Sequence, residues 1–155
     1  MAWYSYFLLN VPETLAMIGL TFILFGISIK ENVKSIVTFS ILYGAAAFSL
    51  NIGMSNSLKP FILLIIYSLL ISIIFRYSFV NGLILSLVSF ILLSFCEITF
   101  SVLYIHLFSL NYDDVLSHPW KRILASYCTA IIPMAVLGVV LNKLPIKIKF
   151  PLLAK

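Results

Sequence analysis

The sequence predicts an all-α fold, a polytopic transmembrane helix bundle of about five spans, and three observations lead to it. Hydrophobic residues make up 63% of the 155-residue chain and charged residues only 10%, whereas soluble domains are about 45–50% apolar and about 25% charged. The mean hydropathy is +1.15. The apolar residues form continuous segments and do not alternate as they would in a transmembrane β-barrel. We therefore expect one integral membrane domain over residues 1–155.

Five apolar segments form the expected spans, since a spanning helix needs roughly 20 residues. They cover residues 12–29, 35–54, 58–75, 79–108 and 123–141, and a basic tail follows over residues 142–155. The third segment is short and the fourth is long, so we expect the fourth to tilt or to leave the bilayer. Pro133 is expected to kink the last segment, because proline cannot continue the helical hydrogen bonds.

The positions of the basic residues predict the orientation. Five spans would put seven of them on one side of the membrane: Lys30, Lys34, Arg76, Lys143, Lys147, Lys149 and Lys155. The other side would hold three: Lys59, Lys121 and Arg122. Because basic residues accumulate in cytoplasmic loops, we expect the N-terminus outside a cell membrane and the C-terminus in the cytoplasm. The net charge of +5 reflects these loops and does not indicate nucleic-acid binding.

One of the five carboxylates, Glu13, stands at the beginning of the first span. Pro12 suits the first turn of a helix, where its missing N–H costs nothing. Glu13 would then meet the positive end of the helix dipole near the outer interface. The simplest interpretation is a carboxylate that stabilises the helix start.

A second carboxylate, Glu97, lies 18 residues into the fourth span, roughly 27 Å from its inner end. It therefore also belongs to the outer part of the membrane. Polar residues share its helical face: Ser86, Ser94, Ser101 and Tyr104. Such a face points into the bundle or into a wet cavity, because lipid offers it no partner.

The outer side thus collects the residues of a candidate site for a cation, a proton or a basic ligand. They are Glu13, Glu97, Tyr104, His106, Asp113 and Asp114, with His118 close by. The alternative is a set of solvated loop residues and one carboxylate that its serine and tyrosine neighbours satisfy.

Catalysis, a metal and a cofactor are not expected. Cys96 and Cys128 lie within apolar segments, where cysteine acts as a small hydrophobic residue, and no metal-type cysteine spacing occurs. The chain contains no HExxH, no GxSxG and no phosphate-binding glycine loop. Asp113 and Asp114 are adjacent, so they do not form the shared pocket of an aspartyl protease.

Small residues along two helices predict close helix contacts. Gly19 and Gly26 are seven residues apart in the first span and are expected to share a face, and the second span carries Ser40, Gly44, Ala47 and Asn51 on one face. Because small residues let helices approach closely in lipid, we expect a homo-oligomer or a membrane protein partner.

Three stretches resemble the N-terminal membrane region of bacterial GHKL-type sensor histidine kinases. They are "VPETLAMIGLTFILFGI", "FCEITFSVLYIHLFSL" and "NYDDVLSHPWKRIL". The resemblance implies a compact dimeric membrane sensor with a cytoplasmic C-terminus. No phosphoacceptor-histidine segment or ATP-binding glycine box follows residue 141, so only a sensing or coupling role is carried over.

Two other classes of function stay open. A small substrate-binding subunit of an energy-coupling importer has similar size and hydrophobicity, although that family usually has six spans and an Ala-x-x-x-Ala motif that is missing here. A structural subunit of a larger membrane complex is the third possibility, since the lysine-rich tail is suited to docking.

Overall fold

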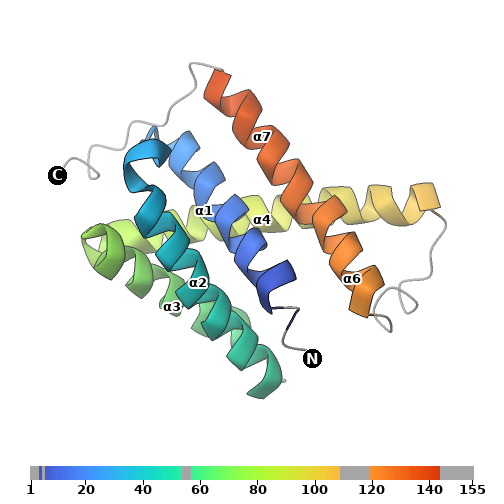
Figure 1. Ribbon diagram of the computed structural model, residues 1–155, viewed down its shortest axis with the longest axis horizontal. Helices are drawn as coiled ribbons and strands as arrows, with labels where there is room; N and C mark the ends of the chain where they lie inside the picture. Colours follow the sequence, from blue (N-terminus) through green and yellow to red (C-terminus); the bar gives the residue numbers. More distant parts are fainter. Residues whose placement is uncertain (1–3, 5, 54–56, 109–118, 144–155) are drawn as a thin grey trace.

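The computed structural model describes residues 4, 6–53, 57–108 and 119–143, and these residues are helical apart from short turns (Figure 1). The elements in chain order are the π-helical turn η1 (Tyr6–Asn10), α1 (Val11–Leu24), α2 (Ile29–Gly53), α3 (Lys59–Phe75), α4 (Phe79–Phe108), α6 (Pro119–Ser126), the π-helical turn η2 (Tyr127–Ile131) and α7 (Ile132–Lys143). The predicted all-α class is confirmed for the described residues.

Four helical segments of the described chain are long and apolar enough to cross a membrane. They are Tyr6–Leu24, Ile29–Gly53, Phe79–Tyr104 and Ile123–Lys143. Helix α3 is apolar but has only 17 residues, the short end of the range for a spanning helix. Length and composition therefore indicate a membrane protein with four long helices, and a fifth span stays a prediction.

The first expected span, 12–29, differs from the helix at both ends. The helix begins with η1 at Tyr6 and ends at Leu24. Gly26 has a φ of 69°, which glycine adopts without strain, and the Ile27 N–H donates to the Phe22 carbonyl at 2.8 Å, as at many helix C-termini. Gly26 is thus part of a turn, and the prediction that it shares a helix face with Gly19 is wrong.

The second expected span, 35–54, starts six residues after the helix that contains it. Helix α2 starts at Ile29, because Lys30, Glu31 and Lys34 are good helix formers although they are polar. A hydropathy boundary marks where apolar residues begin, and a helix can extend beyond it.

Each proline within a long helix follows a π-helical turn. Pro12 comes two residues after η1 and Pro133 two residues after η2. Proline lacks the N–H that would bond to the carbonyl four residues earlier, and its ring presses on that carbonyl. A wider π-helical turn accommodates this interruption, and such turns are frequent at functional sites.

Helix α1 occupies the centre of the bundle, where it contacts α2, α4 and α7. Helix α3 packs against α2 and α4, and α4 crosses the other helices (Figure 1). The start of α1, the end of α2, the start of α3, the later part of α4 and the end of α6 all contribute to one cavity. That end of the bundle is called the cavity end below.

Aromatic rings fill the core between α1, α2 and α3. The fully buried ring of Tyr67 meets Phe39 and Tyr43 edge to face, with ring centroids 4.8 and 4.9 Å apart. Phe22 meets Phe75 in the same way at 4.9 Å. Such pairs contribute about 0.5–1.5 kcal/mol beyond the burial of their area, so this cluster fixes how the three helices pack.

Hydroxyl groups join α1, α3 and α4 within this core. The hydroxyls of Thr21 and Ser89 are 2.7 Å apart, and the Tyr67 hydroxyl donates to Ser89 Oγ at 3.2 Å. Ser68 and Ser86 form a second pair at 2.7 Å. These bonds satisfy polar groups that lipid and an apolar core would leave without partners.

Gly82 lets α3 and α4 approach closely beside these hydroxyl pairs. A Cβ at Gly82 would lie 2.5 Å from Ser72 Oγ and 2.7 Å from the Ser68 carbonyl oxygen. No side chain fits there, and a glycine at such a contact is typical of helix pairs in membranes.

The outward faces of the helices are covered with large apolar side chains. More than half of the surface of several is exposed, including Phe61, Ile73, Ile91, Phe95, Ile98, Val102 and Val136. A soluble monomer rarely exposes so much contiguous apolar surface, whereas lipid tails cover such a surface readily.

Candidate ligand cavity

A cavity of about 290 Å³ lies at the cavity end, and residues of every long helix line it. Its polar lining consists of Asn10, Glu13, Thr14, Tyr43, Asn51, Glu97 and Ser126. Its apolar lining consists of Leu9, Met17, Ala47, Leu63, Phe90 and Leu93. No lysine, arginine or histidine of the described residues lines it. The described part of the lining is thus amphipathic, and its ionisable groups are two carboxylates and one phenol.

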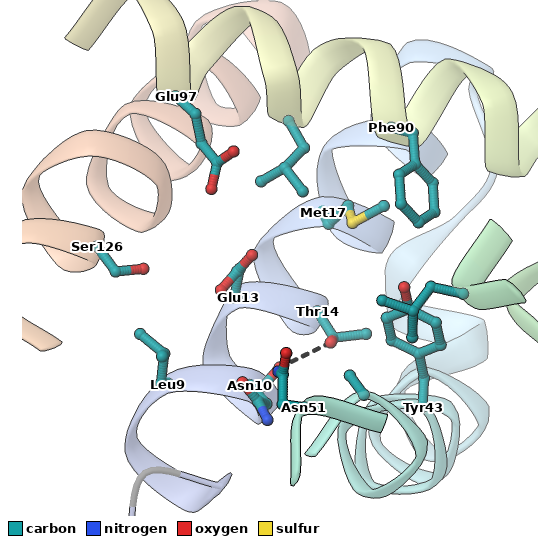
Figure 2. A pocket seen from close by; sticks show the side chains of 13 residues that line it. Leu9, Asn10, Glu13, Thr14, Met17, Tyr43, Asn51, Phe90, Glu97 and Ser126 are labelled. Carbon is teal, nitrogen blue, oxygen red and sulfur yellow. Dashed lines mark hydrogen bonds between the residues drawn. The ribbon is translucent and has the colours of Figure 1, made fainter. Parts of the chain in front are cut away.

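Glu13 faces this cavity from the first helix. Glu13 lies in the first turn of α1, as the sequence predicts, and the π-helical turn η1 precedes that turn. The Thr14 hydroxyl donates to the Asn10 carbonyl oxygen at 2.7 Å, which ties the first turn of α1 to the π-helical turn. Glu13 is half-buried, and its carboxylate points into the cavity (Figure 2).

Glu97 faces the same cavity from α4. It is exposed at the rim, while its neighbour Cys96 is fully buried. Phe90 and Leu93 precede it by seven and four residues, so they share its helical face, and both line the cavity. Figure 2 shows the carboxylates of Glu97 and Glu13 directed towards each other from two helices, with Ser126 on the same side of the cavity. The structure therefore brings these two acids together across 84 residues of sequence.

The serines on the helical face of Glu97 do not form a single polar stripe. Ser86 is buried and pairs with Ser68 of α3, whereas Ser94 is exposed and Ser101 is half-buried. On this face of α4, the residues that line the cavity beside Glu97 are Phe90 and Leu93, and the predicted serines do not line it. The environment of Glu97 is thus more apolar than the sequence predicts.

The other predicted site residues do not line the cavity or lie outside the described residues. Tyr104 is half-buried and His106 is exposed. They follow Glu97 by seven and nine residues on α4, about 10–14 Å further along the axis. Asp113, Asp114 and His118 lie outside the described residues.

The small residues of α2 have two different roles. A Cβ at Gly44 would lie 3.1 Å from Val11 Cγ2 and 3.2 Å from Tyr6 Cε2, so Gly44 lets α2 approach the first helix of the same chain. Ala47 and Asn51, one and two turns later, line the cavity. These residues therefore shape the interior of this chain, whereas the sequence suggests them as contacts with another.

Gly19 lies in a separate groove at the opposite end of the bundle. This groove has a volume of about 210 Å³ and runs between α1 and α7, with Gly138 on the facing helix. A Cβ at Gly19 would meet no atom within 4 Å. Gly19 is therefore free of close contacts within the described chain.

Several cavity residues escape sequence reasoning, although a periodic signal marks them. Tyr43 precedes Ala47 and Asn51 of the predicted small-residue face by four and eight residues on α2, and Asn10 precedes Thr14 by four in the first helix. That spacing puts them on one face, but Ala47 and Asn51 are predicted as helix contacts, and no role is predicted for Tyr43, Asn10 and Thr14. The buried hydroxyls of Thr21, Tyr67 and Ser89 are also missed, since each stands alone in its own helix.

The cavity does not have the donor set of a typical metal site. Among the described residues, no group of three or more His, Cys, Asp or Glu side chains could hold a metal ion. Two carboxylates that line one cavity nevertheless favour positive charge there, and electrostatic attraction is stronger at low effective dielectric constant than in water.

Comparisons with protein-family models, with curated proteins and with solved structures found no match to this chain. The resemblance to sensor histidine kinases therefore stays a prediction from the sequence.

Proposed function

We propose that this chain is a non-catalytic sensing or coupling protein of a cell membrane, and that it binds a positively charged ligand in the cavity. The observation that carries the proposal is that Glu13 and Glu97, from two different helices, line one cavity. Intramembrane carboxylates are costly, and in membrane proteins they usually mark binding sites or proton pathways.

The expected topology gives this cavity its direction. With five spans and the positive-inside rule, the cavity end belongs to the outer side, where the N-terminus lies. Lys30, Lys34, Arg76 and Lys143 belong to the opposite end. A ligand would then enter from outside, and the response would leave through the basic inner end.

Helix α1 is suited to transmit binding. It carries Glu13 and contacts α2, α4 and α7, so a cation held between Glu13 and Glu97 would draw α1 and α4 together. The π-helical turns η1 and η2 flank the cavity, and a helix shifts more easily where its hydrogen bonds are already irregular. A membrane partner or a second copy of the chain would receive the movement.

Replacing the carboxylates tests the binding step. Glu13→Gln and Glu97→Gln keep the shape of the side chain and remove its charge, and Glu31→Gln, at the exposed start of α2, is the matched control. We expect the full chain in lipid nanodiscs to be stabilised thermally by protons, metal cations or organic ammonium ions. That stabilisation should disappear in the two cavity variants only. A thermal response that is equal in all three variants would contradict the proposal.

Cysteine labelling tests the topology independently. Single-cysteine variants at Ser57 and Asn32, made in a background without Cys96 and Cys128, are exposed to an impermeant maleimide in intact cells. Labelling at Ser57, beside the start of α3, and protection at Asn32, near the start of α2, are expected. The reverse pattern would invert the orientation and direct the cavity inward.

A transport subunit is the second candidate, because one observation favours it. The groove of Gly19 and Gly138 opens beside α1 at the end opposite to the cavity. Helix α1 therefore borders the cavity at one end and this groove at the other. Uptake of a radiolabelled cation into proteoliposomes separates the two functions, since a sensor binds its ligand without carrying it across.

A further inference from the structure

We infer that the groove between α1 and α7 binds one anionic phospholipid of the surrounding membrane. One acyl chain would lie along Gly19 and Gly138, and the phosphate group would lie at the end of the groove beside Asn142 and Lys143. The site is separate from the ligand cavity, so this inference does not rest on the proposed function.

The two walls of the groove are built alike. Helix α1 and helix α7 each contribute five residues, at the same spacing of i, i+1, i+4, i+5 and i+8, which is one face of a helix. In each wall a large apolar residue and an alanine come first, and a glycine stands in the middle. The residues are Leu15, Ala16, Gly19, Leu20 and Ile23 from α1, and Met134, Ala135, Gly138, Val139 and Asn142 from α7.

The groove has a buried floor and one open side. Leu20, Met134 and Gly138 are buried, whereas Ala135 and Val139 are exposed. Both helices belong to segments that are long and apolar enough to cross a membrane. The open side therefore faces the surroundings of the bundle, which in a bilayer are lipid tails.

The width of the groove suits a hydrocarbon chain and not another helix. Each wall extends over eight residue steps, about 12 Å at about 1.5 Å per residue. A volume of about 210 Å³ over that length corresponds to a mean cross-section of about 18 Å² and a width of about 4 Å. An α-helix with its side chains is about 10–12 Å across, whereas non-bonded carbon atoms in contact are about 3.5–4.0 Å apart. The groove is thus as wide as one acyl chain.

Basic residues surround the end of the groove that lies away from the ligand cavity. Asn142 ends the wall of α7, and Ile29 lines the groove from the start of α2. The residues that follow them, Lys143 and Lys30, are exposed. The charged residues described at this end of the bundle are four basic ones and one carboxylate: Lys30, Lys34, Arg76, Lys143 and Glu31. Basic pockets between membrane helices bind anionic lipid head groups.

The apolar and polar parts of the groove have the same order as those of a lipid. Gly19 and Gly138 each lie five residues before the last residue of their helix, so the apolar part lies within the membrane. Asn142 is the one polar side chain among the described residues of the lining, and it lies at the basic end. Its amide can donate to a phosphate oxygen, and a lysine ammonium group adds a charge-assisted bond.

Native mass spectrometry of the full chain tests the site. The chain is released from nanodiscs that mix phosphatidylglycerol and phosphatidylcholine with the same acyl chains, and it should retain one phosphatidylglycerol in preference to phosphatidylcholine. Gly19→Leu fills the groove from α1 and Ala135→Leu fills it from α7, so each should lower the retained lipid about tenfold. Gly53→Leu is the matched control, because a Cβ there also meets no atom within 4 Å and α2 ends there, at the cavity end.

Lys30→Gln and Lys143→Gln test the head group. A lysine near an anionic membrane surface strengthens binding about fivefold, so each variant should lower the preference for phosphatidylglycerol by about that factor. Lys59→Gln, at the start of α3 and so at the cavity end, is the charge-matched control and should keep the preference of the wild-type chain.

Three outcomes would overturn the lipid site. They are unchanged retention in Gly19→Leu and Ala135→Leu, equal retention of the two lipids by the wild-type chain, and a dimer without retained lipid that Gly19→Leu dissociates. The last result would assign the groove to a second copy of the chain. Thermal unfolding in phosphatidylcholine nanodiscs shows whether each variant is folded, and if Gly19→Leu is not, Ala135→Leu and the lysine variants decide.

Discussion

Two groups of polar side chains lie inside this apolar bundle, and they differ in what surrounds them. Between α1, α3 and α4, the hydroxyls of Thr21, Tyr67 and Ser89 bond to one another at 2.7 and 3.2 Å. At the cavity end, Glu13 and Glu97 point into an open volume of about 290 Å³. The first group is enclosed between packed helices, whereas the second lines a cavity.

The comparison shows that the polarity of a membrane helix does not by itself indicate a binding site. Unpaired polar groups are costly in a bilayer, so a polar residue there either meets a partner in the protein or faces a cavity. Substitutions in the hydroxyl network should therefore lower stability, and substitutions at the cavity should lower binding. Three predictions sharpen this contrast.

The largest effect is expected at Gly82, beside the hydroxyl network. Gly82→Ala would put a methyl group 2.5 Å from Ser72 Oγ and 2.7 Å from the Ser68 carbonyl oxygen. Forcing α3 and α4 apart should lower the free energy of unfolding by roughly 1–3 kcal/mol, as measured by unfolding in mixed detergent micelles.

Gly19→Ala is the matched control, because a Cβ there meets no atom within 4 Å. It should leave stability unchanged or raise it by up to about 1 kcal/mol, since alanine restricts the unfolded chain more than glycine does. If Gly82→Ala were as stable as Gly19→Ala, the close contact of α3 and α4 would not exist as described.

The next effect separates two tyrosines whose rings are in contact, with centroids 4.9 Å apart. Tyr67 bonds to Ser89, so Tyr67→Phe should cost about 1 kcal/mol, near the range measured for hydrogen bonds within membrane proteins. Tyr43→Phe should cost less than about 0.5 kcal/mol, because its hydroxyl has no partner among the described residues. Thermal unfolding of both variants measures the difference, and equal losses would mean that the two polar groups do not differ.

The sequence predicts the helical segments well because a long apolar segment in a bilayer must satisfy its own backbone hydrogen bonds, and a helix does so. The fourth segment, 79–108, coincides with α4 (Phe79–Phe108), and the third differs from α3 (Lys59–Phe75) by one residue. The errors lie where polar residues continue a helix, as at Ile29, or where glycine ends one, as at Gly26. A hydropathy profile contains neither kind of information.

The cavity is less predictable, because it depends on how helices face one another. The depth of Glu13 and Glu97 follows from counting residues, and their outer location suggests one site. That Tyr43 and Phe90 also face it, and that Tyr104 does not, depends on helix rotation. Rotation is decided by contacts between helices, such as the ring of Tyr67 against Phe39, which no single segment encodes.

The smallest effect is expected at Pro133, which follows the π-helical turn η2 near the cavity. Proline and a π-helical turn often occur together, but here packing also holds the turn, because Thr129 and Ala130 are buried and η2 contacts α1 and α4. Pro133→Ala restores an N–H without removing those contacts, so stability should change by less than about 0.5 kcal/mol. The thermal stabilisation by cations should stay the same, since Ser126 keeps its place at the cavity. Loss of that stabilisation, with stability unchanged, would show that the proline and not the packing positions the last helix at the cavity.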